Sequence, residues 1–134
     1  MERFSDWPQR LRRAIEDKRN LASVWGVNDC AICTADFVLA QTGVDFAAEY
    51  RGRYSDEAGA YALLAELGYA DLPALVDARL PRREGRAQRG DVLWHPGRFG
   101  NFLGIAWSAG VVAPGPDRLL VHPLRTPLIV WAVA

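Results

Sequence analysis

The sequence predicts an α+β domain in which N-terminal helices pack on a C-terminal antiparallel sheet. Up to about residue 80, apolar residues recur at helical spacing between capping residues and glycines. From Gly90 onward, short apolar runs are separated by Gly and Pro, which is typical of consecutive antiparallel strands. The 134 residues contain no internal repeat and no linker, so we expect one domain spanning residues 1–134.

The elements of the two halves follow from their start and stop signals. Helices are expected where Ser or Asp can cap a first turn and Gly or Asn can end the last one. They run from Ser5 to Asn20, Asp29 to Gln41, Ser55 to Leu67 and Asp71 to Leu80. The predicted strands are Asp91–His95, Phe102–Trp107, Val111–Ala113, Leu119–His122 and Leu128–Val133. Trp25, between the first two helices, is expected to anchor the core.

Composition and charge exclude several classes of function. Lys and Arg number 16, as do Asp and Glu, so the formal net charge of zero indicates neither nucleic-acid binding nor an acidic disordered tail. The first residues lack a continuous apolar segment, and no later apolar run reaches transmembrane length. We therefore expect a protein that is made and folded in soluble form, with no membrane span.

The only cysteines are Cys30 and Cys33, which lie on one predicted helix. A C-x-x-C pair is typical of redox and metal sites, but no second pair or nearby His completes a metal site. The element order also does not alternate as a thioredoxin-like fold requires. We expect no metal and no cofactor, and we expect Cys33 to be a buried apolar residue.

Cys30 is the candidate nucleophile. It follows the capping residue Asp29, so its thiol is expected in the first turn of a helix, where the dipole and free N–H groups favour a thiolate. The like charge of Asp29 opposes ionisation of the thiol. Two interpretations stay open: an active nucleophile, or a core cysteine that acts as a small apolar side chain.

Three motifs in this order resemble the NlpC family of papain-like cysteine peptidases. That family usually shows an Asp-Cys-Ser-Gly-Phe helix start, a Gly-Asp-Leu strand and a strand beginning His-Val-Gly-Ile. The corresponding pieces are Asp29–Cys33, Arg89–Leu93 and Phe102–Ile105. The resemblance implies a papain-like fold of NlpC type, with Cys30 as nucleophile, a histidine base on the second core strand and a polar orienting residue on the next.

Further segments look like the small NlpC-like proteins that tailed bacteriophages and gene transfer agents encode among their tail-tip genes. They are Trp25–Cys30, Arg51–Tyr54, Gly90–Val92 and Val130–Val133. This resemblance implies a component of the virion tail that is made in the cytoplasm of a bacterial host. The implied partners are tail hub or other tail-tip proteins and, for an active enzyme, peptidoglycan.

The base and the orienting residue of the family do not have matching residues in this chain. Phe102 stands at the position of the motif histidine, and the orienting position falls near Ala113. Neither side chain can accept a proton. The chain's two histidines, His95 and His122, end strands beside prolines and are the remaining candidate bases for Cys30.

These residues favour a tail-tip protein with a degenerate cysteine peptidase fold and a mainly structural role. Its sheet edge and its loops at residues 94–102 and 51–54 are expected to dock onto hub proteins. The alternative is an active peptidase or amidase that opens the cell wall, with Cys30 as nucleophile, His95 or His122 as base and Asn101 as an oxyanion donor. A toxin- or immunity-type relative is a third hypothesis that no particular residue supports.

Overall fold

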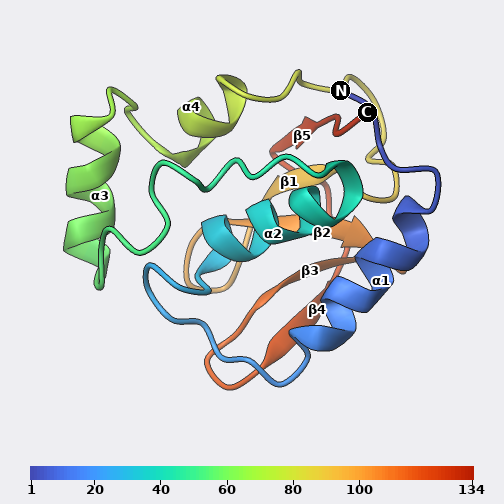
Figure 1. Cartoon of the computed structure of the whole chain (residues 1–134), viewed down its shortest axis with the longest axis horizontal. Coiled ribbons are helices and arrows are strands. Elements are labelled where there is room, and N and C mark those ends of the chain that lie inside the picture. The colour runs from blue at the N-terminus through green and yellow to red at the C-terminus, as the bar shows by residue number, and fades with distance from the viewer.

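Helices cover one face of a five-stranded antiparallel sheet in the computed structural model, which describes residues 1–134 (Figure 1). The helices come first in the chain and the strands follow, so the predicted α+β class is confirmed. The helices are α1 (Trp7–Asp17), α2 (Cys30–Thr42), α3 (Glu57–Glu66) and α4 (Leu72–Asp77). The strands are β1 (Val92–His95), β2 (Phe102–Trp107), β3 (Gly110–Pro114), β4 (Leu119–Pro123) and β5 (Ile129–Trp131).

Aspartate caps fix the starts of three helices. The side chains of Asp29, Asp56 and Asp71 each accept a hydrogen bond from the backbone N–H three residues further on, at 3.0, 2.7 and 2.8 Å. Gly43, with a φ of 78°, ends α2 in the left-handed conformation, as the sequence predicts. None of the four helices combines the length and the apolar character needed to cross a membrane.

Two helices end earlier than the sequence predicts. After Asp17, the N–H groups of Lys18 and Arg19 also bond to carbonyls three residues back, so the end of α1 tightens into a 3₁₀-like turn. Helix α4 ends at Asp77 rather than at Leu80. Pro81 follows Leu80 directly and disfavours helical backbone at the residue before it.

The strand order in the sheet is β4-β3-β2-β1-β5. The first four strands form a meander of antiparallel neighbours, and the chain then passes from β4 at one edge to β5 at the other. Strand β1 therefore lies between β2 and β5, and it pairs Trp94 with Leu103 on one side and with Ile129 on the other. The predicted strands agree with the observed ones to within about two residues at each end.

The pleat of the sheet divides its side chains between two apolar clusters. The helix face carries Val92, Leu103, Ile105, Val112 and Trp131, which belong to the main core with residues of α1 and α2. The outer face carries Leu93, Phe102, Ala106, Val111 and Val130, with Ala87 packed on them. Because side chains alternate along a strand, a shift of one residue moves a side chain from one face to the other.

The turn between β2 and β3 contains only Ser108 and Ala109, whose φ angles are 51° and 58°. Positive φ at both central residues suits the twist of a two-residue hairpin, but it places the Cβ atoms of ordinary residues close to the backbone. Glycine, which lacks Cβ, adopts this conformation without that cost.

We predict that Ala109→Gly stabilises the protein by about 0.5–1 kcal/mol, because relief of the left-handed strain exceeds the added chain entropy. The measurement is urea unfolding at equilibrium. Ala62→Gly, in the exposed interior of α3, is the matched control and should cost about 1 kcal/mol. Equal destabilisation by both variants would contradict the role assigned to the turn.

Candidate functional site

Cys30 is the first residue of α2, and its half-buried side chain lines a groove of about 520 Å³. We call this the Cys30 groove. Its walls come from the segment before α2, from α3 and from the loop between β1 and β2. The principal side chains are Trp25, Tyr54, Glu57, Tyr61, Trp94, Phe99 and Asn101.

The carboxylate of Asp29 fixes the position of Cys30. Asp29 is 5% exposed, and its side chain accepts hydrogen bonds from the N–H groups of Ile32 and Gly26, both at 3.0 Å, and from the Tyr54 hydroxyl at 2.5 Å. One buried carboxylate therefore joins the start of α2, the turn before it and the loop that crosses it. Burial of a carboxylate without such donors would cost several kcal/mol.

Gly26 allows the two loops at this carboxylate to touch. Its φ is +78°, and a Cβ placed there would lie 1.9 Å from the carbonyl oxygen of Tyr54. The carbonyl of Gly26 also accepts a hydrogen bond from the N–H of Gly52 at 2.9 Å. The glycine before the cysteine is therefore explained by close backbone packing of Gly26 against the segment from Gly52 to Tyr54.

The thiol of Cys30 is protonated at neutral pH. Burial raises its pKa to about 11, and the negative charge of Asp29 acts in the same direction. Polar contacts with the backbone of Leu103 and Ala31 only partly oppose this rise in the pKa. The thiolate expected from the helix start is therefore not favoured here, because the helix end is desolvated and capped by a carboxylate.

The alignment that placed Phe102 and Ala113 in the catalytic positions is not supported by the faces of the sheet. Phe102 packs on the outer face, whereas Cys30 packs with the core on the helix face. Ala113 lies on the same side as Phe102, since a Cβ at Gly104 would meet the side chains of both Val111 and Ala113. The next residue back along β2, Asn101, lines the Cys30 groove.

Both histidines gather around Phe102 on the outer face. The ring centroids of His95 and His122 lie 5.5 Å and 4.7 Å from that of Phe102. His95 is 2% exposed, its Nδ1 lies 2.9 Å from the carbonyl oxygen of Pro96, and its Nε2 accepts a hydrogen bond from the N–H of Arg125 at 3.1 Å. Neither histidine lines the Cys30 groove, so the structure does not bring the candidate bases together with the candidate nucleophile.

Sequence reasoning did not place two of the groove residues, Trp25 and Trp94, while Asn101 was expected near Cys30 as an oxyanion donor. Trp25, expected in the core, is 44% exposed and lines the groove. Trp94 lies on the helix face opposite Leu103, and Asn101 is the residue before β2. Alternation counted back from the apolar residue Leu103 would have placed Asn101 on the face of the thiol, and the pairing of Trp94 with Leu103 places Trp94 on the same face. Cys33, expected to be buried, is 0% exposed.

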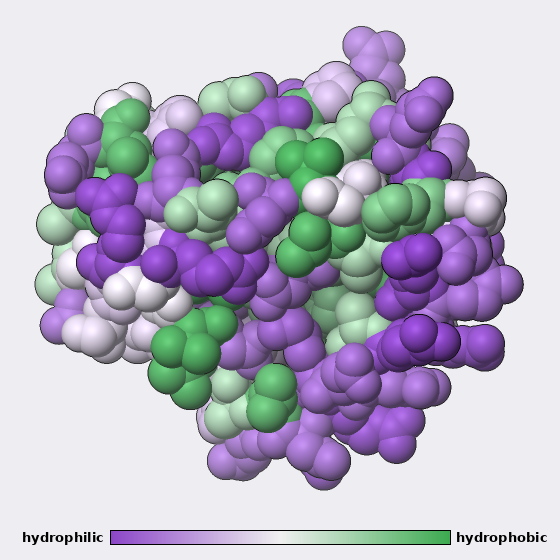
Figure 2. Space-filling model, viewed as in Figure 1, coloured by the Kyte–Doolittle hydropathy of each residue, from purple (hydrophilic) through white to green (hydrophobic).

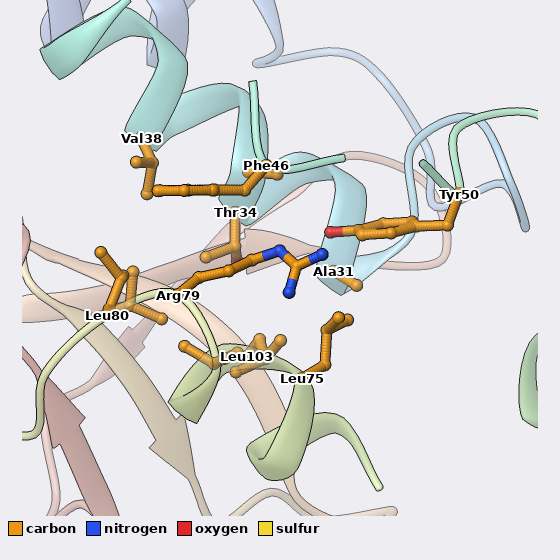
Figure 3. Close-up of a pocket in the computed structure, with 12 residues that line it drawn as sticks. Ala31, Thr34, Val38, Phe46, Tyr50, Leu75, Arg79, Leu80 and Leu103 are labelled. Carbon is orange, nitrogen blue, oxygen red and sulfur yellow. The ribbon is translucent and has the colours of Figure 1, made fainter. Parts of the chain in front are cut away.

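A second cavity of about 40 Å³ lies between α2, α4 and the sheet (Figure 3). Its wall is apolar apart from Thr34, Arg79 and the hydroxyl of Tyr50, toward which the Arg79 guanidinium points. Arg79 forms an ion pair with Glu49 and donates to the Tyr69 hydroxyl at 2.9 Å. No cysteine, histidine or carboxylate lines this cavity, and no group of three or more His, Cys, Asp or Glu side chains in the structure is arranged to hold a metal ion.

Comparison with known proteins identifies the family. Residues 2–133 match the sequence model of a family described as "Domain of unknown function (DUF6950)". The chain belongs to this family. The DUF6950 chain also resembles the crystal structure of the NlpC/p60 domain of the peptidoglycan hydrolase SagA, with a TM-score of 0.57 and 18% identity over 92% of this chain and 97% of that one. A search of curated protein sequences found no match.

This structural likeness confirms the predicted papain-like fold of NlpC type. At 18% identity it establishes the fold alone. Within that fold, the DUF6950 chain places a cysteine at the start of the helix that packs on the sheet, but it places both histidines on the other face. The chemistry therefore has to be argued from the residues of this chain.

We predict that His122 reduces stability at mildly acidic pH. Burial and the neighbouring His95 lower the pKa of His122, so the folded state binds fewer protons than the unfolded state below about pH 6.5. The stability contributed by neutral His122 is therefore fully present above the pKa of the unfolded state. It is lost as the pH falls through the pKa of the folded state. Unfolding free energies measured from pH 7.5 to 5.5 should fall less steeply for His122→Gln than for the parent protein, and equal slopes would contradict this.

Proposed function

We propose that this protein is a non-hydrolytic domain of the NlpC/p60 fold that serves as a structural part of a phage or prophage tail tip. The fold likeness to a peptidoglycan hydrolase domain supports a hydrolase-related origin. The motif order around Trp25–Cys30, Arg51–Tyr54 and Gly90–Val92 supports the tail-tip assignment. The composition of the Cys30 groove supports the loss of catalysis.

The observation that carries the proposal is that no proton acceptor faces Cys30 from the sheet. The strand side chains on the side of the thiol are Trp94, Asn101 and Leu103, and none of them accepts a proton near neutral pH. A cysteine nucleophile needs an adjacent base or a lowered pKa. Cys30 has a raised pKa of about 11 and no imidazole on its side of the sheet, and the nearby carboxylate of Asp29 opposes ionisation, so about one thiol in ten thousand is ionised at pH 7.

The exposed loops suit a docking role in the tail. Phe99, between β1 and β2, is 95% exposed, and Val121 on the edge strand β4 is 60% exposed. The segment Arg51–Tyr54 is held against Gly26 and presents Arg51 and Arg53 at the surface. In this proposal these surfaces contact hub or other tail-tip proteins, and the protein is found in the virion tail.

The retained thiol and the size of the groove are what an active peptidase or amidase would require. In that competing function, His95 or His122 acts as the base. Either imidazole would have to leave the outer face and reach the helix face, past the buried residues of β1, β2 and β3. The two functions are therefore separable by the reactivity of Cys30.

We predict slow alkylation of Cys30 and rescue by a histidine on the correct face. At pH 7, iodoacetamide should react with Cys30 at least tenfold more slowly than with a model thiol, because the pKa of the thiol is raised to about 11. Asn101→His places an imidazole on the wall of the groove and should increase the rate by roughly tenfold or more, since each unit of pKa is a tenfold change in thiolate.

Phe102→His is the matched control, because its side chain lies on the outer face and should leave the rate unchanged. Cys30→Ala measures any background from the buried Cys33. Alkylation of the parent protein as fast as that of a free thiol would refute the non-hydrolytic function. Acceleration by Phe102→His alone would refute the assignment of faces.

We predict that purified protein releases no peptides from peptidoglycan, while a chromosomally tagged copy is recovered in purified particles after prophage induction. Release is measured by chromatography of soluble fragments, with Cys30→Ala as the matched blank. Cleavage that disappears in Cys30→Ala would establish the peptidase alternative. Absence of the tagged protein from the tail fraction, with a known tail protein present, would contradict the tail-tip role.

A further inference from the structure

A cluster of arginines and tryptophans lies where α1 meets the end of β2, and its residues do not line the Cys30 groove. The Arg89 guanidinium lies over the rings of both Trp7 and Trp107, at 5.2 and 5.3 Å from their centroids. The Arg3 guanidinium lies over Trp7 at 4.1 Å. The two indoles meet edge to face at 6.4 Å. We call these four residues the Arg–Trp cluster.

Gly90 packs closely against Gln41 and Arg3 and so fixes the position of the Arg–Trp cluster. Gly90 has a φ of +88°, and a Cβ there would lie 2.6 Å from Gln41 Oε1 and 2.7 Å from Arg3 Nη2. The Nε of Arg3 donates to that Gln41 oxygen at 2.8 Å. The Gly90 of the Arg-Gly-Asp-Val run therefore brings Arg89 and Arg3 together on the edge of the core.

The positive charges of the cluster are not neutralised within the protein. Neither Arg3, Arg89 nor the nearby Arg12 has a carboxylate within 4.0 Å, whereas the neighbouring Arg83 pairs with the buried Asp91 at 2.7 Å. Burial lowers the pKa of Arg3. Attraction by Asp91 opposes this fall, and repulsion from Arg83 and Arg89 adds to it, so that the pKa remains below its usual value. Stacking on indole faces holds these guanidiniums in place without supplying a counter-charge.

The cluster borders two hollows of about 220 Å³ each, which share Arg89 and Trp107. The first hollow is also lined by Pro8, Gln9 and Arg12 of α1. Arg12 and Arg89 are both exposed, so their N–H groups are available on the wall of the same hollow. Polar residues gather at the surface over α1 in the space-filling view (Figure 2).

We propose that the hollow between Arg12, Arg89 and Trp107 binds the phosphate group of a phosphorylated ligand. A guanidinium fork matches the oxygens of a phosphate, and a phosphate monoester carries a charge of about −1.5 to −2 at pH 7. The two guanidiniums on this hollow can donate to separate oxygens of one phosphate, which a monoester and a diester both present. The chain as a whole has no net positive charge, so the attraction is local to this site.

Binding is tested on the full chain by NMR titration at low ionic strength, following the indole N–H signals of Trp7 and Trp107. The probes are glycerol 3-phosphate, as a free monoester, and a short poly(glycerol phosphate) chain, as a phosphodiester polymer. Saturable shifts with either probe support the site, and the tighter of the two identifies the source of the phosphate. Glycerol without phosphate should cause no shift.

Arg12→Gln is the deciding variant, because Arg12 is exposed and does not take part in the stacking on the tryptophans. It should weaken phosphate binding about tenfold, the effect of losing one charge-assisted hydrogen bond. Arg118→Gln removes the same charge from an exposed position between β3 and β4 and should leave the affinity unchanged. Absence of saturable shifts with both probes, or equal weakening by the two variants, would overturn the proposal.

Discussion

The buried carboxylate of Asp29 is the interaction on which the candidate site depends. Its three donors belong to the turn before α2, the first turn of α2 and the loop at Tyr54, so one side chain ties together segments that are 25 residues apart in sequence. The same carboxylate that places Cys30 also raises the pKa of its thiol. Stability of the helix start and reactivity of the thiol are therefore opposed at this position.

The faces of the sheet determine what Cys30 can do. A papain-like site requires the imidazole and the thiol on the same side of the strands, and here the imidazoles of His95 and His122 enclose Phe102 on the other side. The hydrogen bond of His95 serves the structure, since its ring accepts from the N–H of Arg125 in the segment that joins β4 to β5, and the ring of His122 packs on Phe102. The histidines of this chain are thus explained by packing and by loop anchoring.

Much of the fold could be predicted because its signals are local. Aspartate caps and glycine stops marked the helices, and short apolar runs marked the strands, to within a few residues. The candidate site was harder to predict, because it depends on which face of the sheet each strand side chain occupies. The motif alignment put Phe102 in the place of the catalytic histidine, but Phe102 lies on the outer face and its neighbour Asn101 lies on the face of the thiol. The exposure of Trp25 and the raised pKa of Cys30 arise from packing between distant segments, which no local pattern encodes.

The strand order has a consequence for how the molecule folds. Strands β1 to β4 pair with their neighbours in sequence, so this meander closes only short loops. Strand β5 must instead reach the opposite edge and pair with β1, and it carries Trp131, which is fully buried and donates to Asp77 at 2.8 Å. We expect β5 to join late, so that the burial of this indole completes the core and makes the transition cooperative.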